Sequence, residues 1–225
     1  MPEPEPPPSP ALAELVAVMA HDLKNPLAAL VTNLHYLRGT LDGVSTDALD
    51  ALDESALVCE TLERLTRNLD LLARRDALEG RRYLVAVGAL VDDVLGRARH
   101  HAATAGVELV GPTAGAHEPV AFVDRDLFRR ALENLLAHAL EHAPRGSRVS
   151  VELTVDEGSV SVVITDARPA LPSPAEAQEG RSLQARYGRG LSLLCAELAA
   201  KPSGATLVID GVPGACRARL TAPSR

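Results

Sequence analysis

Apolar residues in the N-terminal part of the chain recur every seven positions, and this spacing limits what that part can fold into. Two series share the repeat: Val16, Leu23, Leu30 and Leu37 form the first, and Leu27, Leu34 and Leu41 the second. Such a repeat is typical of a helix that packs along a narrow seam against other helices. We therefore predict one long helix from about residue 11 to residue 40.

A second amphipathic helix is predicted after a short turn at Asp42 and Gly43. Ser45 begins a run of residues that commonly cap a helix N-terminus. Apolar residues again recur seven apart as far as residue 78: Leu52 and Cys59, Leu62 and Leu69, Leu65 and Leu72. A single helical hairpin cannot cover its own apolar stripe, so we predict that two chains pack as a four-helix bundle, which makes the protein a homodimer.

The pattern changes after residue 78, and residues 79–82 are the predicted domain boundary. Helices are predicted at 87–101, 125–142 and 188–200, a strand hairpin at 149–155 and 160–165, and further strands at 83–85, 107–110, 120–123, 206–209 and 216–220. This order predicts an α/β sandwich with a mainly antiparallel sheet. The fold class is therefore α+β, with a helical domain over 11–78 and a sandwich over 83–225.

Composition excludes several classes of function. The net charge of −7 argues against nucleic-acid binding, which needs a basic face. No apolar run approaches the roughly 18 residues of a membrane span, so we expect no membrane insertion. Three scattered cysteines indicate a reducing compartment, and we expect a cytoplasmic protein.

The proline-rich residues 1–10 should be a disordered tail, and residues 167–187 should be a mobile loop.

The first chemical motif lies inside the first predicted helix. His21 is followed by Asp22, Lys24, Asn25 and Pro26. At about 100° per residue, His21 projects roughly a third of a turn away from the apolar stripe, at the edge of the bundle. Asp22 can hydrogen-bond one ring nitrogen or take its proton, which leaves the other nitrogen as a nucleophile.

Three further groups follow along the sandwich. They are, in order, Asn134 and His138 on a helix, Asp166 at the end of a strand, and Gly188, Gly190 and Leu191 at a helix start. In this order of motifs the chain resembles the sensor histidine kinases, whose catalytic domain belongs to the GHKL ATPase superfamily. The resemblance covers nearly all of the chain after the proline-rich tail.

The resemblance assigns roles to the first motif. It implies that His21 is phosphorylated, that Asp22 is its acid/base partner, and that Asn25 helps to place water for dephosphorylation of the partner protein. It also implies that the phosphate passes to the receiver aspartate of a response regulator, as in a two-component phosphorelay.

The resemblance also implies a site for ATP and Mg²⁺. Asn134 matches the first asparagine of the family's nucleotide box, and Asp166 matches the acid that contacts adenine. Gly188 and Gly190, directly before Leu191, match the glycines that let backbone amides approach phosphates at a helix N-terminus.

Some positions depart from the family's pattern. His138 stands where the family has an asparagine that holds Mg²⁺, and imidazole suits this oxygen-preferring cation poorly. Glu141 stands where a lysine is common, and Pro169 follows Asp166 where the family has glycines. We therefore predict weak ATP binding and keep open a histidine phosphotransferase, or a pseudokinase scaffold whose degenerate domain does not bind ATP.

A further alternative comes from the same helix. The residues from His138 to His142 fit the zinc-peptidase signature H-x-x-E-H, in which Glu141 could act as the base. A zinc peptidase also needs an acidic ligand from another helix, and the downstream candidate is Glu197.

Overall fold

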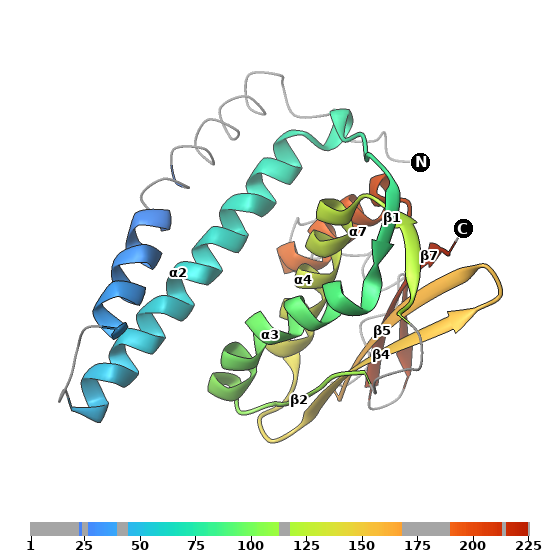
Figure 1. Ribbon diagram of the computed structural model, residues 1–225. Coiled ribbons are helices and arrows are strands. Elements are labelled where there is room, and N and C mark those ends of the chain that lie inside the picture. The colour runs from blue at the N-terminus through green and yellow to red at the C-terminus, as the bar shows by residue number, and fades with distance from the viewer. Residues whose placement is uncertain are drawn as a thin grey trace, which may run out of the picture. The chain divides into compact units, whose positions relative to one another are not determined.

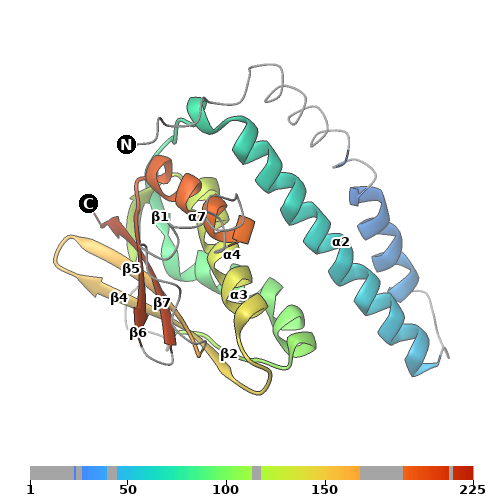
Figure 2. The same cartoon turned by 180° about the vertical axis from the view of Figure 1, so that it is seen from behind.

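The computed structural model contains two compact units that divide between Ala77 and Leu78. It describes residues 23, 27–39, 45–112, 118–167, 190–212 and 215–224. The first unit is a helical hairpin and the second is an α/β sandwich (Figures 1 and 2), so the predicted fold class is confirmed. The predicted tail and, apart from the exposed Ala167, the predicted loop lie outside the described residues.

The hairpin consists of a helix over residues 27–39 and α2 (Thr46–Ala73), which lie side by side in both views. Ser45 caps α2, as predicted, since its side chain accepts a hydrogen bond from the backbone N–H of Ala48 at 3.4 Å. Arg38 and Asp53 form an ion pair between the two helices.

The two seven-residue series of the first helix have different surroundings. In the second series Leu27 is buried and Leu34 is half-buried. In the first series Leu23, Leu30 and Leu37 are 45, 50 and 42% exposed. Among the described residues, one chain therefore covers the second series and leaves the first as an apolar stripe on the surface of the hairpin.

The sandwich is built on a five-stranded sheet in the order β2-β4-β5-β7-β6, in which only the β2–β4 pair is parallel. Its strands are β2 (Glu108–Val110), β4 (Arg148–Asp156), β5 (Ser159–Asp166), β6 (Thr206–Val212) and β7 (Ala215–Pro223). Figures 1 and 2 show α3 (Val87–Ala105), α4 (Arg125–His142) and α7 (Gly190–Ser203) along one face of this sheet. The mainly antiparallel sheet was predicted.

Leucine, valine and alanine make up most of the core of the sandwich. Side chains from α3, α4, β4 and β5 meet around a cavity of only about 10 Å³: Val91, Val94, Leu95, Leu132, Leu136, Val151, Val162 and Ile164. Burial of one such leucine or valine stabilises the fold by about 1.5–3 kcal/mol. The sandwich therefore has an apolar core of its own, although some apolar side chains such as Leu84 and Phe122 on the ribbon are 50 and 44% exposed.

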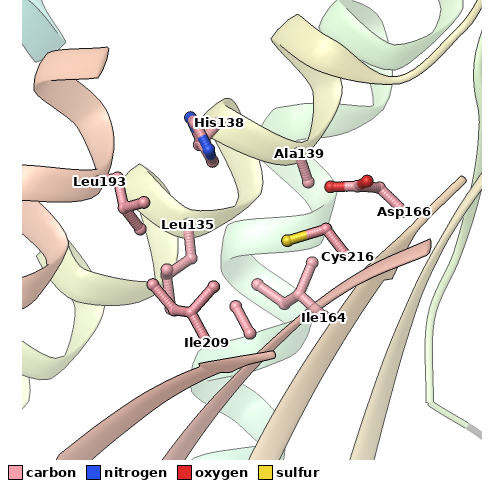
Figure 3. Close-up of a pocket in the computed structure, with 9 residues that line it drawn as sticks. Leu135, His138, Ala139, Ile164, Asp166, Leu193, Ile209 and Cys216 are labelled. Carbon is pink, nitrogen blue, oxygen red and sulfur yellow. The ribbon is translucent and has the colours of Figure 1, made fainter. Parts of the chain in front are cut away.

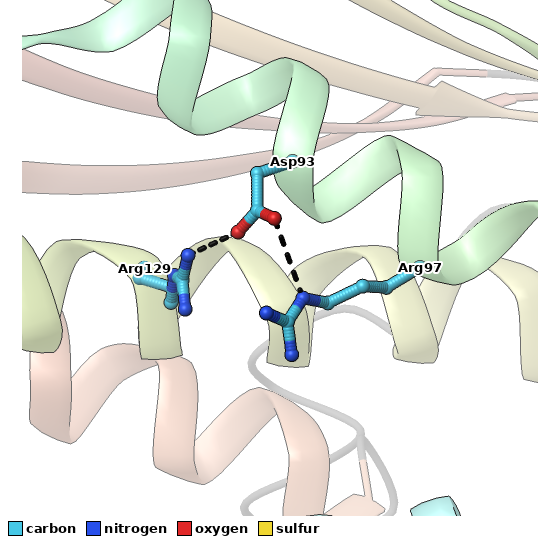
Figure 4. Close-up of polar contacts among 3 residues, drawn as sticks. All are labelled: Asp93, Arg97 and Arg129. Carbon is cyan, nitrogen blue, oxygen red and sulfur yellow. Dashed lines mark hydrogen bonds and ion pairs between the residues drawn. The ribbon is translucent and has the colours of Figure 1, made fainter. Parts of the chain in front are cut away.

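Polar contacts also join α3 to α4 (Figure 4). Asp93 on α3 forms an ion pair with Arg129 on α4, and its other carboxylate oxygen lies 3.5 Å from Nε of Arg97. The side chain of Arg129 is 21% exposed, so this pair is partly shielded from solvent.

One carboxylate fixes the start of the sandwich. Oδ1 of Asp124 accepts hydrogen bonds from the amides two and three residues later, at 3.1 and 3.0 Å, and so caps α4. Oδ2 of Asp124 accepts from the amide of Arg81 at 2.7 Å. A Cβ at the preceding Gly80 would lie 1.9 Å from the carbonyl oxygen of Pro202, so any other residue here requires the backbone to shift.

Two details differ from the prediction. The helix predicted to end at His101 continues to Ala105, because residues 102–105 suit a helix and the stop is Gly106, with a positive φ of 67°. Short strands β1 (Tyr83–Ala86) and β3 (Val120–Val123) pair with each other as a separate ribbon. The strands were predicted but this pairing was not, since short apolar runs do not identify their partners.

Candidate functional site

His138 and Asp166 both line one small cavity of the sandwich (Figure 3). His138 lies on α4 and is 3% exposed, and Asp166 is the last residue of β5 and is 2% exposed. The remaining lining residues come from α4, β5, α7, β6 and β7: Leu135, Ala139, Ile164, Leu193, Ile209, Cys216 and Ala218. The fold therefore brings together two of the residues that the sequence singled out.

The cavity holds about 10 Å³, which is close to the space of one water molecule. Leu193 on α7 and Cys216 on β7 are 1 and 3% exposed and line this cavity. A flat ring such as a nucleotide base enters only if these side chains move. Sequence reasoning missed both residues as part of the site, and only the position of Cys216 in a strand beside β5 could have suggested it.

Asn134 lies one turn before His138 on α4 and is 2% exposed. Its Nδ2 donates a hydrogen bond to the carbonyl oxygen of Arg130 at 2.9 Å. Among the described residues, the cavity is lined by His138 and not by Asn134. The structure therefore places Asn134 on the expected helix but does not bring it to the cavity.

The end of α4 gathers three side chains that can bind a metal ion. His138, Glu141 and His142 each offer one ligand atom, and these atoms all lie within 4.8 Å of one another. Two imidazoles and one carboxylate do not fit Mg²⁺, which prefers oxygen ligands in octahedral geometry. In the described part of the chain Glu197 does not belong to this group, so the further acid that a zinc peptidase needs is not supplied by it.

Several predicted site residues lie outside the described residues. These are His21, Asp22, Asn25 and Gly188. Gly190 is the first residue of α7 and Leu191 the second, so the predicted helix start is present there. The roles of all six residues stay predictions.

Two family models match the chain in order. Residues 11–78 match the His Kinase A (phospho-acceptor) domain. Residues 123–225 match the Histidine kinase-, DNA gyrase B-, and HSP90-like ATPase.

No helix among the described residues is long and apolar enough to cross a bilayer.

Individual proteins agree with these models. The chain is 26% identical to Sensor protein IrlS of Burkholderia pseudomallei, over 72% of this chain and 34% of that protein. It is 27% identical to Histidine protein kinase DivJ of Caulobacter vibrioides, over 90% of this chain and 36% of that protein. The chain thus spans about a third of the length of these curated relatives.

A solved structure supports the fold over most of the chain. Full-length ShkA, crystallised in complex with AMPPNP, superposes with a TM-score of 0.61 and 20% identity, over 93% of this chain and 45% of that one. The family models and the curated relatives identify the histidine kinase family, and none of the comparisons favours the phosphotransferase, the scaffold or the peptidase.

Proposed function

Since this chain belongs to the sensor histidine kinase family, we propose that it is a protein-histidine kinase of two-component signalling. ATP phosphorylates His21, and the phosphate then passes to the receiver aspartate of a response regulator. The observation that carries the proposal is the order of the two matched domains, a phospho-acceptor hairpin followed by an ATPase-type sandwich. The meeting of His138 and Asp166 at one cavity supports a ligand site in that sandwich.

The proposed chemistry needs a nucleophile and a base in the hairpin. Asp22 holds or removes the proton on one ring nitrogen of His21, which leaves the other nitrogen free to attack the γ-phosphorus of ATP. A P–N bond forms and the bond to the leaving ADP oxygen breaks. In the second step the carboxylate of the receiver aspartate attacks the same phosphorus, and His21 is released.

The nucleotide half of the site is proposed to bind ATP weakly. We assign Asp166 to the adenine, and Gly190 with Leu191 and Gly188 to the phosphates, beside Asn134. The small cavity supports weak binding, because its volume of about 10 Å³ is far less than a base needs. The side chains at the end of α4 do not fit Mg²⁺, so the proposed chemistry assigns no role to that ion at this position.

A homodimer is part of the proposal. The exposed Leu23, Leu30 and Leu37 form a stripe seven residues apart, which a second hairpin can cover in a four-helix bundle. We also place the protein in the cytoplasm, because its three cysteines are buried and form no disulfide, as in proteins of a reducing compartment.

The test is phosphorylation of purified protein by ATP labelled at the γ-phosphate. The expected label is stable in alkali and lost in acid, as a phosphoramidate is, and His21→Ala removes it. His35→Ala is the matched control, since His35 is an exposed histidine of the helix over residues 27–39, and it should keep the label. Label that survives in the His21→Ala protein refutes the assignment.

A further inference from the structure

The end of α4 carries a set of nitrogen and oxygen donors to which the proposed phosphotransfer steps assign no chemical role. His138, Glu141 and His142 are spaced i, i+3 and i+4 on the helix, so they lie within about 100° of arc on one face. Their ligand atoms lie within 4.8 Å of one another, and the two imidazole rings are 4.4 Å apart between centroids. The helix alone therefore brings the three donors together.

A hydrogen bond orients one of these ligands. Nδ1 of His142 lies 2.9 Å from the carbonyl oxygen of His138. A carbonyl oxygen only accepts hydrogen bonds, so Nδ1 carries the proton and Nε2 is left with its lone pair. Histidines that bind metal ions commonly donate their other ring N–H in this way, which fixes the tautomer and the ring orientation.

The position on the helix also favours a cation. His142 is the last residue of α4, where the helix dipole presents partial negative charge and stabilises positive groups. Glu141 adds a full negative charge at an exposed position. The helix dipole and the charge of Glu141 both attract any cation, and the donor atoms decide which cation is preferred.

We propose that His138, Glu141 and His142 form a binding site for a borderline divalent metal ion of the Zn²⁺ type. Imidazole and carboxylate ligands suit Zn²⁺, and three protein ligands leave its fourth position for water or an oxygen of another ligand. The site includes His138, which stands where the family's pattern has a magnesium ligand. This chain therefore has nitrogen donors at a position where the family has an oxygen ligand. This inference concerns metal binding alone and does not depend on the proposed kinase activity.

The experiment is a calorimetric titration of the full chain, freed of metal by a chelator, with Zn²⁺. One Zn²⁺ should bind per chain, and Co²⁺ in its place should give the visible spectrum of a tetrahedral site. His142→Ala and Glu141→Gln, both at exposed positions, should weaken Zn²⁺ binding by more than about tenfold, since even the loss of an outer partner of a ligand costs about 10–100-fold.

The matched control is His100→Ala, because His100 is an exposed helical histidine on α3, outside this cluster. It should leave Zn²⁺ affinity unchanged, and an excess of Mg²⁺ should not displace Zn²⁺. Equal affinity in the wild type, His142→Ala and Glu141→Gln overturns the proposal, as does displacement by Mg²⁺ or no binding at micromolar protein.

Discussion

The hairpin and the sandwich use their leucines differently. Leu23, Leu30 and Leu37 of the hairpin are between 42 and 50% exposed, whereas Leu135, Leu193 and Leu220 of the sandwich are 2% exposed or less. These leucines of the sandwich therefore lie in its own core, whereas those of the hairpin form an exposed apolar stripe, which we propose a second hairpin covers. The difference suggests that substitutions in the hairpin act through assembly, and those in the sandwich through folding and ligand binding.

The largest effect is expected for Leu30→Asp, compared with Leu84→Asp in the sandwich; both leucines are 50% exposed. A dimer buries Leu30 twice, and each buried leucine is worth about 1.5–3 kcal/mol, so Leu30→Asp should weaken dimerisation by about 10²-fold or more. Leu84→Asp should leave it unchanged. Sedimentation equilibrium measures both, and equal weakening by the two variants breaks the comparison.

A second contrast concerns glycines. Gly80→Ala should lower the free energy of unfolding of the sandwich by about 1–3 kcal/mol, because its new methyl group meets the carbonyl oxygen of Pro202. Gly39→Ala in the hairpin meets no atom within 4 Å and should be neutral, or stabilising by up to about 1 kcal/mol. Urea denaturation followed by circular dichroism compares them. An undisturbed Gly80→Ala protein contradicts the close approach.

The third prediction tests whether His138 on α4 is the position that weakens ATP binding. His138→Asn restores an oxygen ligand and should tighten binding of ATP in Mg²⁺ by about tenfold, or 1.4 kcal/mol, while Zn²⁺ binding falls. His142→Asn, one turn later, is the control and should not improve ATP affinity. Isothermal calorimetry measures both, and an unchanged affinity in His138→Asn means that the metal position is not what weakens binding.

The smallest expected effect is on the free energy of unfolding, and it compares the loss of two ion pairs. Asp93→Ala removes the ion-pair partner of Arg129. It should lower the free energy of unfolding by about 1 kcal/mol, since the side chain of Asp93 is 39% exposed and the pair is screened by solvent. Glu63→Ala in the hairpin removes an i, i+4 pair with Arg67 at 3.7 Å and should cost about 0.5 kcal/mol or less. Chemical denaturation at low and high salt compares them, and a larger loss for Glu63→Ala reverses the order.

Local signals carried much of the fold prediction. The bounds predicted for α4 agree with the structure, because Asp124 caps its start and Pro144 follows its end. The ribbon of β1 and β3 could not be predicted, since pairing between residues about 40 positions apart depends on the packing of the whole sandwich.

The candidate site was predictable only in part. The residues His138 and Asp166 were found through the order of motifs, and the fold brings them to one cavity. The contribution of Cys216 depends on which strands are neighbours, which no local pattern encodes. His21, Asp22, Asn25 and Gly188 lie outside the described residues, and their roles remain predictions from the resemblance.

The anchoring of Gly80 and Arg81 decides where this chain can be cut and rejoined. Their contacts with Pro202 and Asp124 belong to the sandwich, although both residues precede its first strand. A hybrid protein that takes its hairpin from a relative keeps those contacts when the crossover lies at residues 74–77. A crossover after residue 82 removes Gly80, which leaves room for the carbonyl oxygen of Pro202. It also removes the native Arg81, whose amide donates a hydrogen bond to Asp124. The modular border in the gene therefore lies upstream of the first strand.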